Sequence, residues 1–259
     1  MKIWVQYNIY TTHNEDLDLI LTDFVIPFLK DNEVVDFFFI RYIDYFGPHI
    51  RLRFFINTSQ IDQLHQTINI FYRKEKQNFD ISLFLRSSLY SKENWKYNNC
   101  SDIVLVEKYF VANSKNAISL ITSKPTMNEK KIFSLFYSIF LLNEFLNPEE
   151  VLDFLKKSFS YWIPDLNTQK NLFVKSEKSK MHIVKQIESV SRINNYKYYV
   201  SEDVKLLKEA IGSNKKDTTD FLFHIIHMFN NRLGISPIEE AYLSIIIYNI
   251  KGGNLFDRN

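Results

Sequence analysis

Residues 37–55, FFFIRYIDYFGPHIRLRFF, contain two aromatic-rich runs on either side of a Gly-Pro turn signal at residues 47–48. Alternate side chains of a β-strand point to the same face, so His49, Arg51 and Arg53 share one face of the second run. The apolar residues between them point to the other face. The stretch therefore predicts a β-hairpin with one cationic face, which is either solvated surface or a receptor for an anionic or carbonyl-bearing ligand.

The segments around this hairpin alternate between strand and helix patterns. Asn14 is a plausible N-cap for the first helix, because acidic residues and an apolar stripe follow it. The expected strands cover residues 3–10, 35–43, 48–56 and 79–87, and the expected helices cover residues 14–28 and 59–74. The order βαββαβ predicts a ferredoxin-like α+β subdomain over residues 1–98.

The rest of the chain, residues 99–259, has helical patterns. The helices are expected at residues 101–122, 129–145, 148–159, 168–192, 201–211, 217–232 and 236–250. Ser236, Pro237 and Glu239 form a capping-box arrangement, and Gly234 ends the helix before it. The predicted fold class is α+β, and we expect the helical subdomain to pack on the sheet subdomain as one cooperative domain.

Composition narrows the class of protein. The chain has 259 residues with 46% hydrophobic residues, which suffices for a packed core, and a formal net charge of +2, which gives no global basic field for nucleic acid. A single cysteine, Cys100, provides no disulfide framework and no thiol pair. With no signal-peptide pattern and no long apolar run, we expect a soluble cytoplasmic protein that uses neither nucleic acid nor a membrane as partner.

Common cofactor and catalytic motifs are absent from the sequence, and five glycines leave little for a phosphate-binding loop, so no cofactor is expected. In HIIHMFNNRLG, residues 224–234, helical spacing places His224, His227 and Asn231 on one stripe with Arg232 beside them. No third ligand lies at helical spacing, so no metal site is expected. His224 is expected to be a packed histidine, whereas His227 is either packed or part of a cleft.

Three segments together resemble the C-terminal elimination domain of class I lanthipeptide dehydratases and its relatives in thiopeptide biosynthesis. They are FFIRYIDYFGPHIRLRF, then YSKENWKYNN (residues 90–99) followed by IVLVEKYFVANS, and then HMFNNRLG. The resemblance extends from Trp4 to the last helix. It implies a protein that handles a ribosomally made peptide containing activated serines or dehydroalanines.

The resemblance also implies roles for individual residues. Arg51 and Arg53 match the hairpin arginines of the family pattern, and Glu93, Lys96 and His227 match its later motif positions. The expected catalytic residues are Arg53, Tyr90, Glu93, Lys96, Tyr97 and His227, and the expected substrate-binding residues are Arg41, His49, Arg51, Asn231 and Arg232. Tyr90 and Tyr97 can equally be half-buried aromatic residues, and Glu93 can simply neutralise Lys92 or Lys96.

The chain departs from the pattern where lysine and asparagine replace arginine and glycine. Lys96 cannot provide the planar fork of an arginine, and Asn98 and Asn99 alter any close backbone approach at the glycine positions. A weakened glutamate-binding site resembles the stand-alone pyridine synthases of thiopeptide pathways, of the micrococcin type. Such a macrocyclase joins two dehydroalanines of a thiazole-containing precursor in a formal aza-[4+2] cycloaddition and releases water and the leader peptide.

Two alternatives remain open beside this RiPP-modifying enzyme of antibiotic (bacteriocin) biosynthesis. One is the glutamate-eliminating half of a split dehydratase, and the other is a non-catalytic peptide-binding scaffold. The expected partner in each case is a precursor peptide with a leader and a modified core, and other enzymes of the pathway are possible partners. Leader binding is assigned to Lys170, Lys175, Lys178, Lys180 and Lys185, which can instead form a solvated helix face.

Overall fold

The computed structural model describes residues 1–32, 34, 36–78, 82–92, 94–97, 103–191, 194–211 and 218–252. The chain divides into two compact units. Unit 1 consists of residues 1–93 and 107–124, and unit 2 consists of residues 94–106 and 125–259. Each unit is described by itself.

Unit 1 is built on a four-stranded antiparallel sheet in the order β2-β3-β1-β4. The strands are β1 (Lys2–Tyr10), β2 (Phe37–Asp44), β3 (Gly47–Asn57) and β4 (Phe84–Ser88). The chain passes from β1 to β2 through η1 (Asn14–Asp16), α1 (Leu17–Leu19), η2 (Ile20–Val25) and α2 (Ile26–Asp31), and from β3 to β4 through η3 (Thr58–Gln60) and α3 (Ile61–Glu75). The described part of unit 1 thus has the expected alternation of strands and helices, and the mixed α+β class is confirmed.

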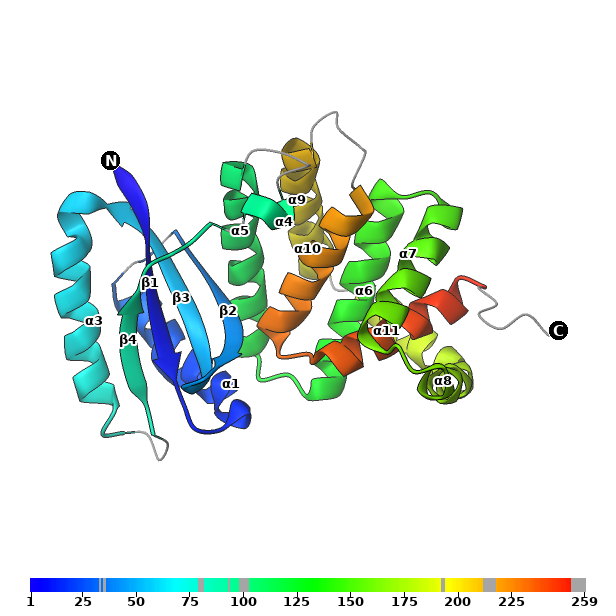
Figure 1. Cartoon of the computed structure of the whole chain (residues 1–259), viewed down its shortest axis with the longest axis horizontal. Helices are drawn as coiled ribbons and strands as arrows, with labels where there is room; N and C mark the ends of the chain where they lie inside the picture. Colours follow the sequence, from blue (N-terminus) through cyan, green and yellow to red (C-terminus); the bar gives the residue numbers. More distant parts are fainter. Residues whose placement is uncertain are drawn as a thin grey trace. The chain divides into compact units, whose positions relative to one another are not determined.

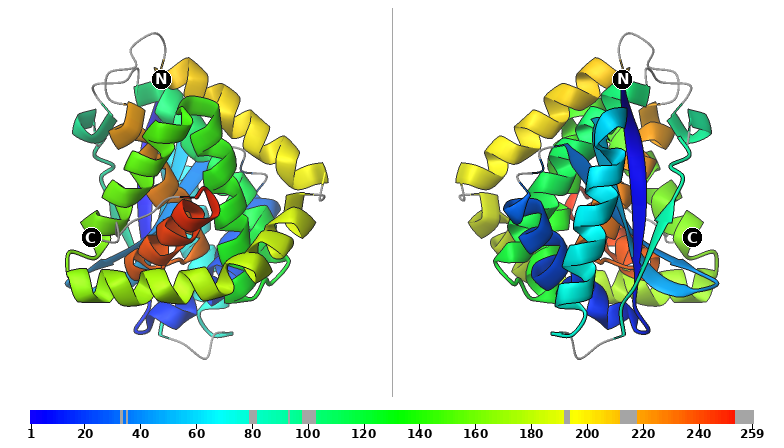
Figure 2. Two further views of the ribbon diagram at one scale, coloured as in Figure 1. Left: turned by 90° about the vertical axis from the view of Figure 1, so that its right-hand side faces the viewer. Right: turned by 90° about the vertical axis from the view of Figure 1, so that its left-hand side faces the viewer.

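One face of this sheet is apolar and carries the core of the unit. Phe54 of β3 lies 5.8 Å from Phe28 of α2, and Phe28 and Phe24 lie 5.4 and 5.1 Å from Phe71 of α3 (ring centroids). Figure 2 shows α3, in cyan, beside the blue α1–α2 segment. These aromatic contacts bury the face that the alternation in residues 50, 52 and 54 predicts to be apolar.

The first helical segment is not a single regular helix. Residues Ile20–Val25 form a π-helical stretch directly before α2, where Pro27 stands at the helix start. Proline has no N–H to donate to the carbonyl four residues earlier and crowds that carbonyl, so the wider turn accommodates it. The apolar stripe of residues 14–28 predicts the helix but not this irregularity.

The hairpin turn lies two residues earlier than the sequence suggests. Asp44 pairs with Gly47, so Tyr45 and Phe46 form the loop, and Gly47 and Pro48 already belong to β3. The Asp44 carboxylate accepts a 2.9 Å bond from the backbone N–H of Phe46, which closes the loop. The expected turn at Gly47 and Pro48 is therefore wrong, because Gly47 serves as the positive-φ residue (φ 114°) that enters the strand.

From Glu107 onward, the helix α5 (Ile103–Thr122) belongs to unit 1 and runs along its edge strand β2. Ser114 Oγ accepts a 3.2 Å hydrogen bond from the backbone N–H of Phe39, and the rings of Phe38 and Phe110 lie 5.5 Å apart. In Figure 1 the blue strand β2 runs alongside the green α5. The helix thereby covers the outer edge of β2.

Unit 2 is helical throughout its described part. Its helices are α4 (Asn94–Tyr97), α6 (Met127–Phe145), α7 (Pro148–Trp162), α8 (Leu166–Ser191), α9 (Asn194–Ile211), α10 (Thr218–Leu233) and α11 (Pro237–Ile250). Tyr137 of α6 stacks on Phe229 of α10 at 4.0 Å. Figure 1 shows α10, in orange, crossing α6, and α11, in red, beside α7. No helix in the described part of the chain is long and apolar enough to cross a lipid bilayer.

The caps expected at the start of α11 are present. Ser236 accepts a hydrogen bond from the backbone N–H of Glu239, and the Glu239 carboxylate accepts one from the N–H of Ser236, with Pro237 in the first turn. Gly234 has φ 80° and ends α10, as expected. This short connection places the first turn of α11 next to the last turns of α10, which matters for the pair described below.

Candidate functional site

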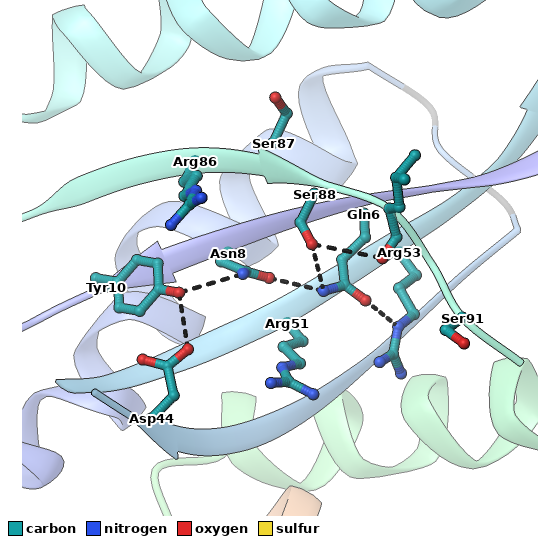
Figure 3. Close-up of a pocket in the computed structure, with 11 residues that line it drawn as sticks. Gln6, Asn8, Tyr10, Asp44, Arg51, Arg53, Arg86, Ser87, Ser88 and Ser91 are labelled. Carbon is teal, nitrogen blue, oxygen red and sulfur yellow. Dashed lines mark hydrogen bonds between the residues drawn. The ribbon is translucent and has the colours of Figure 1, made fainter. Parts of the chain in front are cut away.

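The second face of the sheet of unit 1 is polar and forms a pocket of about 600 Å³ (Figure 3). The strand register places Gln6, Asn8 and Tyr10 of β1 opposite Arg53, Arg51 and His49 of β3. The pocket is lined by Gln6, Asn8, Tyr10, Asp44, Arg51, Arg53, Arg86, Ser87, Ser88, Leu89 and Ser91. The cationic face expected from the hairpin is therefore a pocket wall rather than a flat surface.

A series of side-chain hydrogen bonds crosses the floor of this pocket (Figure 3). Arg53 Nε donates to Gln6 Oε1 at 2.7 Å, and Gln6 Nε2 donates to Asn8 Oδ1 at 2.9 Å. Asn8 Nδ2 then donates to the Tyr10 hydroxyl at 3.3 Å, which donates to Asp44 Oδ2 at 3.0 Å. The floor is pre-organised, because each buried amide group has a partner along the series.

Arg51 is held between a histidine and a tyrosine. Its Nε donates to His49 Nε2 at 3.2 Å, and its guanidinium carbon lies 3.3 Å from the centroid of the Tyr42 ring. His49 Nδ1 lies 3.1 Å from the carbonyl of Gly47, which can only accept, so Nδ1 carries the proton and Nε2 is free to accept from Arg51. The side chain of His49 is fully buried, so it fixes Arg51 from behind and does not line the pocket.

The electrostatics of this region favour a neutral His49 and an ionised Asp44. Burial lowers the pKa of His49, and the proximity of Arg51 adds to this effect. Burial raises the pKa of Asp44, but hydrogen bonds from Phe46 and Tyr10 and the positive charge of Arg51 outweigh it, and the pKa lies below its ordinary value. The pocket thus combines arginines with one ionised carboxylate that is already bonded by Tyr10.

Tyr90 lies close to Arg53 and has a carboxylate partner of its own. The Arg53 guanidinium carbon is 4.9 Å from the ring centroids of both Tyr90 and Phe38. The Tyr90 hydroxyl donates to Glu107 at 3.0 Å, and Lys92 Nζ is 3.5 Å from the same carboxylate. The structure therefore brings together Arg53 and Tyr90, two of the residues expected to be catalytic.

Arg41 does not join this group. It pairs across the sheet with Ile50, so its side chain points to the opposite face from Arg51 and Arg53. There its guanidinium contacts the carboxylate of Asp18 at 2.5 Å, and its side chain is 10% exposed. Its position makes Arg41 a partner of Asp18 on the apolar side, away from the pocket that Arg51 lines.

In unit 2 the expected histidine His227 is paired with a buried carboxylate. His227 Nδ1 lies 3.0 Å from Glu240 Oε2, and the exposed fractions of the two side chains are 22% and 3%. The ring of His227 lies 5.1 Å from Trp162. Of the two interpretations left open for His227, a packed residue or a cleft residue, the geometry shows a partly exposed ring held by a buried acid.

The other expected residues of unit 2 lie on or near α10. Tyr97 is buried against Phe221 and His224, with ring centroids 6.1 and 6.0 Å away. His224 also lines a pocket of about 340 Å³ with Phe154, Lys157, Ser158, Tyr161, Thr219, Asp220 and Phe223. Lys96 and Asn231 are half-buried. Arg232 has an exposed fraction of 0%, so it is a buried residue of the helical unit.

Several expected positions lie outside the described part of the chain. These are Glu93, Asn98, Asn99 and Cys100, and the side chain of Lys180. The lysines 170, 175, 178 and 185 of α8 are exposed. Among the residues that the structure describes, no group of three or more histidine, cysteine, aspartate or glutamate side chains has the geometry to hold a metal ion.

Sequence reasoning misses most of the supporting residues. Gln6, Asn8 and Arg86 enter the pocket only through strand pairing, although their period of two in β1 and β4 is visible in the sequence. Glu240 directly follows the capping-box residue Glu239 and has no sequence motif of its own. No local pattern predicts its contact with a histidine 13 positions earlier. Glu107 lies in a helix 17 residues beyond Tyr90 and has no motif around it.

Comparison with solved structures shows a shared fold at low identity. The tRNA-dependent lantibiotic dehydratase MibB from Microbispora sp. 107891 matches with a TM-score of 0.65 and 16% identity over 96% of this chain, which spans 28% of the MibB chain. The pyridine synthase TbtD from thiomuracin biosynthesis has a TM-score of 0.66 and 10% identity, over 95% of this chain and 97% of TbtD. TsrL has a TM-score of 0.65 and 11% identity, over 96% and 94% of the two chains.

The sequence itself gives a more direct assignment. No curated protein matches the chain significantly. The sequence profile of the family described as lantibiotic biosynthesis dehydratase C-term matches residues 4–250, nearly the whole chain. The chain therefore belongs to the lantibiotic dehydratase C-terminal domain family.

Proposed function

We propose that this protein is a thiopeptide pyridine synthase. Its reaction is a formal aza-[4+2] cycloaddition between two dehydroalanines of a thiazole-containing precursor peptide, followed by loss of water and of the leader peptide. The product is a macrocycle closed by a pyridine ring. Family membership and the end-to-end similarity of fold to a pyridine synthase support this proposal.

The observation that carries the proposal is the pre-organised pocket on the polar face of unit 1. Arg51 and Arg53 are each held by a hydrogen bond from Nε and by aromatic rings, so their positions are set before a ligand arrives. Fixed cationic donors stabilise the charge that develops on a carbonyl oxygen when a backbone amide shifts to its iminol form. The remaining rate enhancement comes from holding the two alkenes together, because positioning alone lowers the activation barrier of such a reaction by several kcal/mol.

Proton transfer is assigned to groups already expected from the sequence. Tyr90, with its hydroxyl bonded to Glu107, and His227, with its free Nε2, are groups that can move a proton during tautomerisation and the closing eliminations. Lys96 and Tyr97 remain proposals of the same kind, and Glu93 is proposed without a described geometry.

The test uses a precursor peptide that carries thiazoles and two dehydroalanines. We expect mass spectrometry to show a product lighter by one water and by the leader peptide, with the absorbance of a substituted pyridine. An unchanged mass under conditions where the peptide binds contradicts the proposal and favours a non-catalytic scaffold of the same fold.

One observation favours a second activity, the elimination of glutamate from a glutamylated serine or threonine. Arg86 joins Arg51 and Arg53 in the pocket lining, and several guanidiniums suit a departing carboxylate. The matched experiment offers a glutamylated precursor peptide. Release of free glutamate together with formation of dehydroalanine supports elimination, and an intact glutamyl ester excludes it.

Two finer assignments are proposals of the same standing. The strand order β2-β3-β1-β4, with helices after β1 and β3, supports a ferredoxin-like interpretation of unit 1. The exposed lysines of α8 support its assignment as the segment that binds an acidic leader peptide.

A further inference from the structure

The pair formed by His227 and Glu240 has the geometry of a histidine held by an orienting acid. His227 lies on α10, and Glu240 lies in the first turn of α11, which the short connection after Gly234 brings alongside. The two side chains meet through Nδ1 and Oε2 at 3.0 Å. No sequence motif contains both residues, so this contact is a product of the fold.

The carboxylate of Glu240 is placed to accept a hydrogen bond from the ring of His227. It lies in the first helical turn, where the N–H groups and the helix dipole stabilise a negative charge. An ionised carboxylate only accepts hydrogen bonds, so the proton of this contact belongs to His227 Nδ1. The other ring nitrogen, Nε2, then carries the lone pair that can accept a proton.

The remaining contacts fix the ring rather than compete for Nε2. Trp162 lies 5.1 Å from the ring of His227 with an angle of 39° between the planes. The imidazole is 22% exposed, and the carboxylate behind it is 3% exposed, so the acid is shielded and the base is accessible. A buried carboxylate beside a partly exposed imidazole is the arrangement that fixes one tautomer and stabilises the protonated ring when it forms.

We propose that Glu240 is the positioning residue that holds His227 in the Nδ1–H tautomer, so that Nε2 acts as the proton acceptor of the reaction. This inference rests on the proposed function. His227 Nε2 takes one proton from a substrate N–H, and the resulting imidazolium is neutralised by the carboxylate of Glu240. The imidazolium gives this proton to the amide oxygen, which forms the iminol and returns the pair to its starting state. After ring closure the hydroxyl group leaves as water with a second proton, which comes from a CH₂ group of the new ring as its double bond forms.

The first test measures the tautomer and needs no substrate. In protein labelled with ¹⁵N-histidine, the ring nitrogens of His227 are assigned by comparison with the His227→Ala variant. We expect the chemical shifts of a protonated Nδ1 and an unprotonated Nε2 at neutral pH. In Glu240→Gln, whose amide can donate to Nδ1, we expect a measurable population of the Nε2–H form. A wild-type ring with its proton on Nε2 overturns the proposal.

The matched control is Glu239→Gln. This substitution removes the charge of the neighbouring glutamate, which bonds Ser236 and Lys131 and does not contact His227. We expect the tautomer of His227 to be unchanged in this variant. If both glutamine variants shift the tautomer equally, the effect belongs to the helix terminus and the inference is wrong.

The second test measures turnover of the dehydroalanine peptide. We expect Glu240→Gln to lower kcat about 10- to 100-fold with a KM changed less than about two-fold, since general base catalysis contributes about 10²- to 10⁴-fold. In a His227→Ala background the same substitution should cause no further loss, because the two residues act as one unit. Additive losses, or an unchanged kcat, contradict a role through His227.

The two tests separate the inference from the proposed function. If the wild-type protein does not convert the dehydroalanine peptide, the proposed function fails, and the tautomer measurement still decides whether Glu240 orients His227. If Glu240→Gln loses its fold by circular dichroism, the wild-type tautomer alone decides.

Discussion

Arg53 is the cation of the pocket with the most extensive support at the scale of single residues. Its Nε donates to Gln6, and its guanidinium lies over the rings of Phe38 and Tyr90. A lysine keeps the charge but loses both the planar stacking and the directed N–H bond. The role of Arg53 therefore depends on shape as well as on charge.

For this reason we expect Arg53→Lys to lower kcat/KM for the dehydroalanine peptide about ten-fold or more, as a hydrogen bond to a charged group is worth about 1.5–3 kcal/mol. The measurement is initial rates by mass spectrometry. Arg73→Lys, on the exposed face of α3, serves as the control and should leave kcat/KM unchanged. Equal kinetics of wild type and Arg53→Lys count against the pocket.

His49 leads to a prediction about pH. Burial lowers its pKa below the ordinary value of 6.5, so the folded protein binds this proton more weakly than the unfolded chain does. Stability is then fully present above about pH 6.5 and falls as the pH drops from there towards the folded pKa. We expect urea unfolding to show a steeper loss of the free energy of unfolding below pH 6.5 in wild type than in His49→Gln. If the free energies of unfolding of wild type and His49→Gln change in parallel with pH, His49 does not contribute to the pH dependence of stability.

The sequence predicts which face of a strand a side chain occupies, because alternate residues share a face. It does not predict contacts that depend on strand pairing or on helix packing. The alternation in residues 49–53 correctly places Arg51 and Arg53 on one face. Arg41 lies on the other face because it pairs with Ile50. This pairing depends on the register of the two strands, which the sequence alone does not give. The burial of Arg232 has no sequence signal, because a polar stripe on a helix normally faces water.

At the scale of the secondary-structure elements, the β2–β3 hairpin depends on Gly47. Its φ is 114°, and a Cβ at this position would lie 3.2 Å from the carbonyl oxygen of Thr11. The same residue also supplies the carbonyl that orients His49. Strain at this point therefore reaches the pocket through the contact between His49 and Arg51.

We expect Gly47→Ala to lower the free energy of unfolding by about 1–3 kcal/mol, the cost of holding a non-glycine residue in this conformation. Gly252→Ala is the matched control, since Gly252 also has a positive φ of 81° but a Cβ there meets nothing within 4 Å. Urea unfolding of both variants separates the two costs. If Gly252→Ala costs as much as Gly47→Ala, the contact with Thr11 adds nothing.

Elements are predictable here where local chemistry marks their ends. The start of α11 is predicted by Ser236, Pro237 and Glu239, and the observed helix begins at Pro237. The sequence does not predict the π-helical stretch before α2 or the early hairpin loop, because both depend on how Pro27 and Gly47 contact the neighbouring backbone. Local caps thus predict boundaries, and irregular geometry needs the packed structure.

At the scale of the whole molecule, the net charge of +2 makes the local distribution of lysines decisive. We expect replacing Lys170, Lys175, Lys178 and Lys185 by glutamine to weaken binding of an acidic leader peptide about ten-fold at low salt, since each exposed ion pair contributes about 0.2–1 kcal/mol. Fluorescence anisotropy of a labelled leader measures this at low and high salt.

The control changes the same net charge elsewhere. Lys74, Lys76, Lys115 and Lys156 are also exposed, and their replacement by glutamine should leave leader affinity nearly unchanged. A similar loss in both variants indicates a general electrostatic attraction. In that case α8 has no special part in leader recognition.

The hydrogen bonds from Arg53 to Asp44 across the pocket floor run in one direction. Arg53 donates a hydrogen bond to Gln6, Gln6 donates one to Asn8, Asn8 to Tyr10, and Tyr10 to Asp44, so the series starts at a cation and ends at an anion. Such a series has a polarity, and no single member can be reversed without turning the others. Gln6→Glu, nearly identical in shape, would remove the donor to Asn8 and leave the amide of Asn8 free to flip. The direction of donation along the whole pocket floor is therefore set by the charged residues at its two ends.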